Sequence, residues 1–231
     1  KKYVYCALDF SSLEKTLNFT QEISKEIGGV KLGLEFFLKY GIEGVQKIKQ
    51  FGIPIFLDLK LNDIPNTVKK ADQNIINLNP EFLTAHISGG KNMLKELVKV
   101  KNKTKIIGVT MLTSLEKNDL KSFGINISES VFVEKLTKVG CESGVDGVVS
   151  SPLEVKQLRE KFGNKLIYIT PGIRMSNDNS DDQKRLSTPG KAISDGSSLL
   201  VIGRSITSSV NPINSINKII ANIRTEIESK N

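Results

Sequence analysis

The chain has 231 residues, 39% of them apolar, which suits one large single domain such as an α/β barrel. It contains no apolar run of about 18 residues and no charged segment leading into an apolar one, so we expect a soluble, cytoplasmic protein without a membrane span or signal peptide. The formal net charge is +8, but the 33 lysines and arginines are scattered along helical patterns without interleaved aromatic residues, so we expect a solvated basic surface and no nucleic-acid partner.

Short β-rich runs alternate with helical patterns along the chain. The predicted strands cover residues 2–8, 30–33, 53–60, 82–86, 105–112, 145–150, 166–170 and 199–202. The predicted helices cover residues 12–27, 36–51, 67–78, 93–100, 128–143, 153–162 and 212–227. This alternation favours a parallel sheet, and eight units in a chain of this length fit a closed (β/α)8 TIM barrel better than a doubly wound sheet. Because no linker divides the chain, we predict a single domain over residues 1–231.

Two long stretches lack any periodicity, residues 113–126 and 173–187. Each follows a predicted strand, at the end of the barrel where such folds place their active sites. The second stretch is rich in Ser, Asn and Asp and is expected to form a mobile lid.

The third predicted strand and the turn after it carry an acid, a lysine and a second acid: Asp58, Lys60 and Asp63. Side chains two residues apart on a strand share a face, so Asp58 and Lys60 should meet at its carboxyl end. Asp63 follows at a strand-to-helix turn that Pro65 suits, because proline fixes φ near the value of a first helical turn. A surface ion pair beside a helix cap would have the same spacing. The residues around these three must therefore distinguish a functional site from such a surface pair.

Two neighbouring strand ends add further charges, Asp9 after the first strand and Lys31 within the second. A charged side chain inside a barrel is costly unless it is paired. The plainer alternatives are a lysine extended to the rim and a carboxylate that caps the following helix.

The last two strands end in glycine- and arginine-containing motifs, TPGIR at 170–174 and VIGRS at 201–205. Barrels of this class hold phosphate in these two loops, through backbone N–H groups and a helix N-terminus. Glycine lets the backbone approach the anion, and Arg174 and Arg204 can bind it bidentately. Gln183, between the motifs, offers an amide donor. Either motif alone is more often a turn, but both together favour a phosphate site.

The remaining reactive residues point to no further site. His86 is the only histidine, which excludes a histidine-centred triad or a multi-histidine metal site within one chain. A core histidine is the plainer interpretation, although His86 could orient the charged cluster. The pair Asp181 and Asp182 is interpreted as a solvated loop face rather than a metal site. Cys6 and Cys141 lie far apart in apolar segments, so we expect reduced, buried thiols.

Seven motifs resemble those of bacterial orotidine 5′-phosphate decarboxylases. They are ALDF (7–10), VKLG (30–33), DLKLNDIPNT (58–67), MLTS (111–114), DGVVSS (146–151), TPGIR (170–174) and VIGRSI (201–206). The resemblance spans essentially the whole chain. DxKxxD alone is shared with other phosphosugar barrels, whereas DIPNT, TPGIR and GRSI together are specific to this family. The resemblance implies a homodimeric barrel that needs no metal or organic cofactor and makes UMP in pyrimidine synthesis.

The resemblance also implies roles for individual residues. Lys60 would donate a proton to C6, within a charge network of Lys31, Asp58, Lys60 and the Asp63 of the other subunit. Asp9, Lys31 and Thr67 would hold the ribose, and Thr113 would lie near the pyrimidine. The implied substrate contacts are Asp9, Lys31, Asp58, Asp63, Ile64, Thr67, Thr113, Pro171, Arg174, Gln183, Gly203 and Arg204.

The residues themselves argue for the same chemistry. Flanking carboxylates favour a charged Lys60, which suits proton donation to a carbanion and not the neutral amine of a Schiff-base aldolase. Asp58 placed near a substrate carboxylate would repel it in the ground state.

Two alternatives stay open. A magnesium-dependent sugar-phosphate decarboxylase or aldolase would need another acidic ligand, for which Glu35 is the nearest candidate. A basic nucleic-acid-binding module gives no reason for paired Asp and Lys at the mouth of a barrel.

Overall fold

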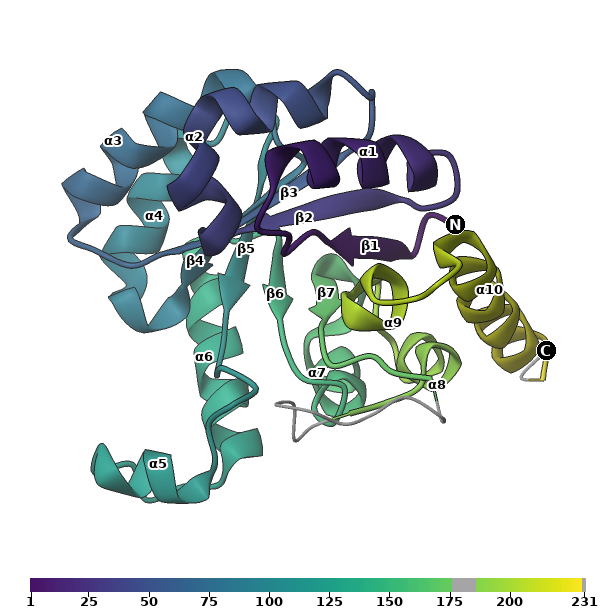
Figure 1. The fold of residues 1–231 in the computed structure, drawn as a ribbon. Coiled ribbons are helices and arrows are strands. Elements are labelled where there is room, and N and C mark those ends of the chain that lie inside the picture. Colours follow the sequence, from purple (N-terminus) through teal and green to yellow (C-terminus); the bar gives the residue numbers. More distant parts are fainter. Residues whose placement is uncertain (176–185, 230–231) are drawn as a thin grey trace.

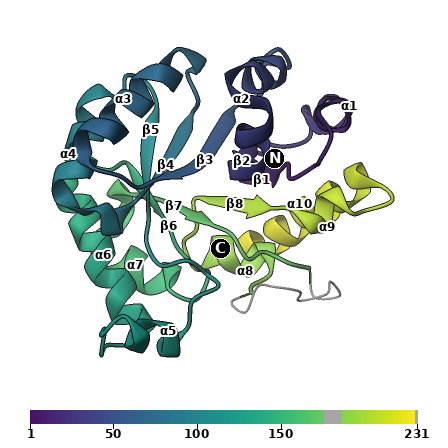
Figure 2. The same ribbon diagram turned by 60° about the vertical axis from the view of Figure 1, so that its left-hand side comes forward.

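In the computed structural model, which describes residues 1–175 and 186–229, eight parallel strands close into a barrel in the order β1 to β8 (Figures 1 and 2). The strands are β1 (Val4–Ala7), β2 (Gly29–Gly33), β3 (Ile55–Leu61), β4 (Phe82–His86), β5 (Lys105–Val109), β6 (Gly147–Val149), β7 (Ile167–Thr170) and β8 (Leu199–Ile202). Each strand pairs with the next, and β8 returns to β1. The (β/α)8 TIM-barrel prediction is confirmed, while the domain limits 1–231 stay a prediction.

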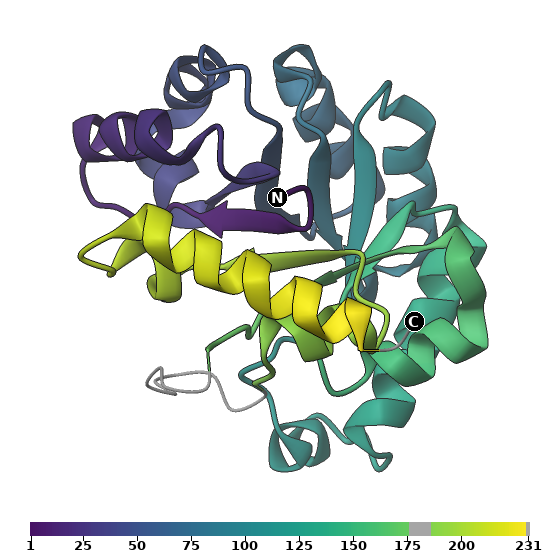
Figure 3. The same cartoon turned by 90° about the vertical axis from the view of Figure 1, so that its right-hand side faces the viewer.

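Helices follow the strands around the outside of the barrel. The longer ones are α1 (Leu13–Ile23), α2 (Leu34–Lys49), α3 (Pro65–Ile75), α4 (Gly90–Val100), α6 (Glu129–Ser143), α7 (Val155–Phe162) and α10 (Pro212–Glu228). Serine side chains cap two of them: Ser12 Oγ accepts from the Lys15 amide and Ser128 Oγ from the Val131 amide. Figure 3 shows α10 running along the outside of the barrel, where it packs against two short helices, α8 (Pro189–Ser194) and α9 (Arg204–Thr207). In the described part of the chain, no helix combines the length and apolar character needed to cross a membrane.

Three short helices differ from the prediction. The stretch 113–126 contains α5 (Lys117–Ser122), and α8 and α9 flank β8. Each has only four to six residues, too few for a 3.6-residue periodicity to emerge from the sequence. Local caps specify α5 instead, since Glu116 and Asp119 form a capping box. Most of the expected lid, residues 176–185 with Asp181, Asp182 and Gln183, lies outside the described residues.

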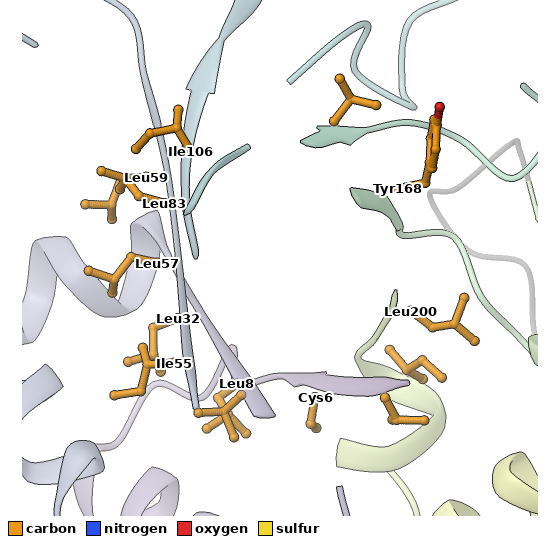
Figure 4. Close-up of a cluster of buried hydrophobic side chains, with 14 of the residues drawn as sticks. Cys6, Leu8, Leu32, Ile55, Leu57, Leu59, Leu83, Ile106, Tyr168 and Leu200 are labelled. Carbon is orange, nitrogen blue, oxygen red and sulfur yellow. The ribbon is translucent and has the colours of Figure 1, made fainter. Parts of the chain in front are cut away.

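Two hydrophobic cores share the strands because successive side chains point to opposite faces. The larger core lies between barrel and helices, and Figure 4 shows part of it, including Leu8, Leu32, Leu57 and Leu83. The smaller core consists of Tyr5, Phe56, Phe82, Ile107 and Ile169, of which Tyr5, Phe56 and Phe82 are the first or second residues of their strands. They fill the interior of the barrel from its amino-terminal end up to the cavity, whose wall includes Phe56 and Ile169.

The two cysteines are both free, as expected. Cys6 is buried in the larger core, whereas Cys141 on α6 is only half-buried and packs against the edge of that core. The expectation of two buried thiols is therefore correct for Cys6 alone.

Candidate active site

The carboxyl end of β3 departs from regular strand geometry. Leu57 pairs with Leu83 and Leu61 with Ala85, so four steps along β3 (57 to 61) oppose two along β4 (83 to 85). Within this bulge Lys60 adopts a left-handed backbone conformation with φ of 49°. Because the excess is two residues, side chains keep their faces. Asp58 and Lys60 therefore meet as expected, but an irregular strand brings them together.

Asp58 lies at the centre of a cluster of charged side chains. Its Oδ2 atom is 2.7 Å from Lys60 Nζ and 3.6 Å from Lys31 Nζ. The Lys31 ammonium is also 3.7 Å from Asp9 Oδ1. The side chains of Asp58 and Lys31 are only 12% and 13% exposed, so this is not a surface ion pair, and Lys31 is not a rim lysine. Ser12, and not Asp9, caps α1.

These neighbours determine the charge state of Asp58. Burial alone would raise the pKa of its carboxyl group, because a charged carboxylate loses hydration in the protein. The charges of Lys31 and Lys60, with hydrogen bonds from Lys60 and Thr84, outweigh burial and hold the pKa below its ordinary value. Asp58 is therefore a buried carboxylate that stays negative at neutral pH.

A cavity of about 300 Å³ opens beside this cluster at the carboxyl ends of the strands. Its wall contains most of the residues that the sequence suggested: Asp9, Lys31, Asp58, Lys60, Thr113, Pro171, Arg174, Gly203 and Arg204. Residues from β1, β2, β3, β7 and β8 and from the loop after β5 thus meet in one space. This space could hold a small molecule with a charged centre at one end and an anion at the other.

Three of the suggested residues lie outside this cavity. Asp63, Ile64 and Thr67 are exposed at the start of α3, and Asp63 Oδ1 accepts a hydrogen bond from the Ile64 amide at 2.6 Å. None of them belongs to the wall of this chain's own cavity. Gln183 lies outside the described residues.

The loops after β7 and β8 form the other side of the cavity. Gly172 turns the chain with φ of 77°, a conformation that favours glycine, and Ile173 forms a bridge with Ser187. Arg174 is held in this loop, because its amide donates to Ser187 O at 3.1 Å and its Nη1 to Ile173 O at 2.9 Å. Its guanidinium is therefore buried at the cavity wall in a fixed position.

Other groups near the site were missed or left open by sequence reasoning. Thr84 hydrogen-bonds Asp58, and apolar strand residues including Val109, Val149 and Val201 line the cavity. The alternation of side chains along each strand could have predicted the apolar residues, because it places each of them on the inward face of the barrel. The pKa of His86 is lowered first by burial and then by the charge of Lys60, so His86 is neutral beside the cluster at pH 7.

The acidic ligand required by the magnesium-dependent alternative does not lie in the cavity. Glu35 is exposed in the first turn of α2. Among residues 1–175 and 186–229, no cluster of three or more His, Cys, Asp or Glu side chains could hold a metal. The acidic side chains of the described residues therefore do not favour a magnesium-dependent sugar-phosphate decarboxylase or aldolase.

Fold and site together define a (β/α)8-barrel enzyme in which one cavity joins an Asp–Lys cluster to a rim that contains glycine and arginine. The model of the Orotidine 5'-phosphate decarboxylase / HUMPS family matches residues 2–219. This chain belongs to that family.

Named relatives are similar over almost the whole chain. Orotidine 5'-phosphate decarboxylase of Ehrlichia canis is 46% identical over 95% of this chain and 97% of its own. The enzyme of the same name from Sphingopyxis alaskensis is 45% identical over 90% and 93%.

Two solved structures share the fold over almost the whole chain. Orotidine 5'-phosphate decarboxylase from Lactobacillus acidophilus superimposes with a TM-score of 0.82 at 34% identity, covering 96% of this chain and 99% of that one. An uncharacterized conserved protein from Geobacillus kaustophilus gives 0.84 at 29% identity, covering 95% and 99%.

Proposed function

We propose that this chain decarboxylates orotidine 5′-phosphate to UMP and CO2 in pyrimidine biosynthesis. The observation that carries the proposal is a buried aspartate between two lysines, 2.7 and 3.6 Å from their ammonium groups, facing a cavity of small-molecule size. Relatives with 45 and 46% identity carry the name of this activity. A cytoplasmic site of action, as expected for this biosynthetic step, is part of the proposal.

In the proposed reaction, the bond between C6 and the carboxylate carbon breaks, CO2 leaves, and the electron pair remains on C6. The Lys60 ammonium then donates a proton to C6, and Lys31 adds a second positive charge within 3.6 Å of Asp58. Electrostatic groups fixed in advance act strongly in a site shielded from water. Asp58, kept negative by the lysines, repels the substrate carboxylate until CO2 departs.

The phosphate is proposed to bind at the opposite wall. The buried Arg174, the backbone of Pro171 and Gly203, and Arg204 border that part of the cavity, with Gln183 as a further donor. A guanidinium fork matches a phosphate dianion bidentately. Binding energy from a group distant from C6 can then be used to position the reacting centre.

The other end of the substrate is proposed to contact the first strands. Asp9 and Lys31 are proposed to hold the ribose and Thr113 to lie near the pyrimidine, while Thr67, outside its own cavity, would join them from a second copy of the chain. The ion pair between Lys31 and Asp9, at 3.7 Å, supports this assignment because it places both at the same wall.

A homodimer with a shared site is proposed to complete the cluster. Asp63 and Ile64 are exposed outside their own cavity, and the exposed apolar side chains of Leu34 and Leu38 follow the neighbouring strand β2. Exposed apolar side chains after two neighbouring strands, β2 and β3, suit a contact with a second copy of the chain, which would receive Asp63 in its cavity.

Subunit mixing tests the shared site. Inactive Asp63→Ala and inactive Lys60→Ala subunits should regain activity when exchanged, because each heterodimer contains one complete site. Verified exchange without recovery would refute the sharing of Asp63.

The function itself is tested by the ultraviolet absorbance of orotidine 5′-phosphate after addition of purified protein in excess EDTA. Wild type should convert it steadily to UMP and CO2, whereas Lys60→Ala should not. Folded wild-type protein without turnover would refute the proposal, and activity that EDTA abolishes would favour the magnesium-dependent alternative.

A further inference from the structure

Thr84 occupies the one position of β4 that faces the bulge in β3. Between the paired residues Leu57–Leu83 and Leu61–Ala85, β3 contributes three residues and β4 contributes Thr84 alone. Backbone groups in such an excess lose their regular ladder partners, and a buried group without a partner is unfavourable. Backbone groups in the bulge of β3 that the β4 backbone cannot reach therefore need a hydrogen-bond partner from a side chain of β4.

The Thr84 hydroxyl supplies two hydrogen bonds at this point. It accepts from the Lys60 backbone N–H at 2.8 Å and donates to Asp58 Oδ1 at 3.0 Å. A hydroxyl group has one O–H donor and oxygen lone pairs that accept, so the Thr84 hydroxyl can make both hydrogen bonds at the same time. Thr84 is fully buried, and water does not compete for these bonds.

These two bonds act on different parts of the charged cluster. The first holds the backbone of Lys60 in its left-handed conformation, with φ of 49°, which a side chain such as lysine rarely adopts. The second fixes Asp58 Oδ1, so that Oδ2 is left for Lys60 Nζ at 2.7 Å and Lys31 Nζ at 3.6 Å. Strained conformations at functional sites persist only where the surroundings enforce them.

We propose that Thr84 is a positioning residue, whose hydroxyl ties the Asp58 carboxylate to the backbone of Lys60 and so sets the direction of the Lys60 ammonium. The inference rests on the proposed function, since it assigns Thr84 a part in aiming the proton donor. Thr84 does not line the cavity and reaches the substrate only through Asp58 and Lys60.

Kinetics of matched variants test the proposal. Thr84→Val keeps the shape and removes the hydroxyl, and its kcat should fall about 10- to 100-fold with KM changed less than about threefold, because ground-state binding contacts remain. Thr84→Ser keeps the hydroxyl and should recover most of kcat. Thr137→Val is the control: Thr137 is also fully buried, but its hydroxyl bonds Val133 O within α6, so its kcat should stay at the wild-type value.

A second measurement does not require turnover. The carboxyl ¹³C chemical shift of Asp58, followed against pH, should titrate at higher pH in Thr84→Val than in wild type or Thr84→Ser, because a hydrogen bond to the charged form is lost. If wild type is inactive on orotidine 5′-phosphate, the proposed function fails, while this titration still decides whether Thr84 holds Asp58.

The outcomes against the proposal are distinct. Wild-type kcat in Thr84→Val overturns it, and so does an unchanged Asp58 titration. Equal losses of kcat in Thr84→Val and Thr84→Ser also overturn it, because they would assign Thr84 a packing role. If Thr84→Val does not fold, Thr84→Ala takes its place and is compared with Thr84→Ser by the same two measurements.

Discussion

Each end of the barrel contains an ion pair between an acid and a lysine, but the two pairs differ in their exposure and in whether a cavity lies beside them. At the carboxyl end, Asp58 lies between Lys31 and Lys60 and borders a cavity. At the amino end, Glu81 accepts a hydrogen bond from the Tyr5 hydroxyl and pairs with Lys105 at 3.4 Å. The carboxylate and lysine there are 34% and 45% exposed, against 12% and 13% for Asp58 and Lys31.

The interior beside each cluster explains the difference. Tyr5 and Phe56 pack edge-to-face against Phe82, with ring centroids 5.7 Å apart in both pairs, and close the amino end. Beyond them the inward positions include Lys31, Asp58 and Lys60, which border a cavity of about 300 Å³. The ion pair at the filled end has no space for a ligand beside it, whereas charges at an open, shielded end can act on a bound molecule.

Removing one lysine from each end of the barrel should give the largest difference between the two ends. Lys60→Ala should lower kcat by more than about a thousandfold, because it removes the proton donor, while the fold remains intact. Lys105→Ala at the amino end should leave kcat unchanged. Both are measured by the loss of orotidine 5′-phosphate absorbance, with circular dichroism to verify folding. Near-normal turnover in Lys60→Ala would refute its role.

Removal of an arginine tests the phosphate wall of the open end. Arg204→Ala should raise KM about 10- to 100-fold, because a charge-assisted hydrogen bond contributes about 1.5 to 3 kcal/mol. Arg224→Ala removes the same charge from the exposed side of α10 and should leave KM unchanged. Steady-state kinetics compare the two variants, and an unchanged KM in Arg204→Ala would place the phosphate elsewhere.

Another buried carboxylate, Asp72, shows the effect of burial when no lysine is paired with the carboxyl group. Asp72 on α3 is 1% exposed, its Oδ2 atom has no hydrogen-bond partner among the described residues, and burial raises its pKa to about 6. Between its ordinary value of 3.8 and about 6, the folded state binds more protons than the unfolded state. The free energy of unfolding therefore falls as pH rises through this window.

Asp72→Asn removes this loss of stability. The gain in unfolding free energy should grow from about pH 4 to pH 6 and then stay constant, at no more than about 3 kcal/mol. Urea unfolding at several pH values measures it. A gain that does not depend on pH would show that the buried charge is not the cause.

The smallest effect is expected at the closed end. Tyr5→Phe keeps the aromatic packing and removes the hydroxyl that donates to Glu81, so it should lower the unfolding free energy by about 1 to 2 kcal/mol. Its kcat and KM should match wild type. Urea unfolding and steady-state kinetics provide both values, and a kinetic defect without a loss of stability would contradict the separation of the two ends.

Much of this molecule could be predicted from its sequence because the signals are local. Residues 82–86 and 199–202 were predicted as strands with the limits that the structure has for β4 and β8. The short helices α5, α8 and α9 were not predicted, because four to six residues carry a cap but no periodicity.

Periodicity, chain order and motifs in the sequence are enough to predict the barrel, the strand ends that carry Asp58, Lys60, Arg174 and Arg204, and membership of a decarboxylase family. The two-residue excess in β3 and the hydrogen bonds of Thr84 became visible only in the folded chain. The same holds for the pairing of Lys31 with Asp58 and for the position of Asp63 outside its own cavity. These features depend on the register between strands and on how separate loops pack, and no single segment of the sequence contains that information.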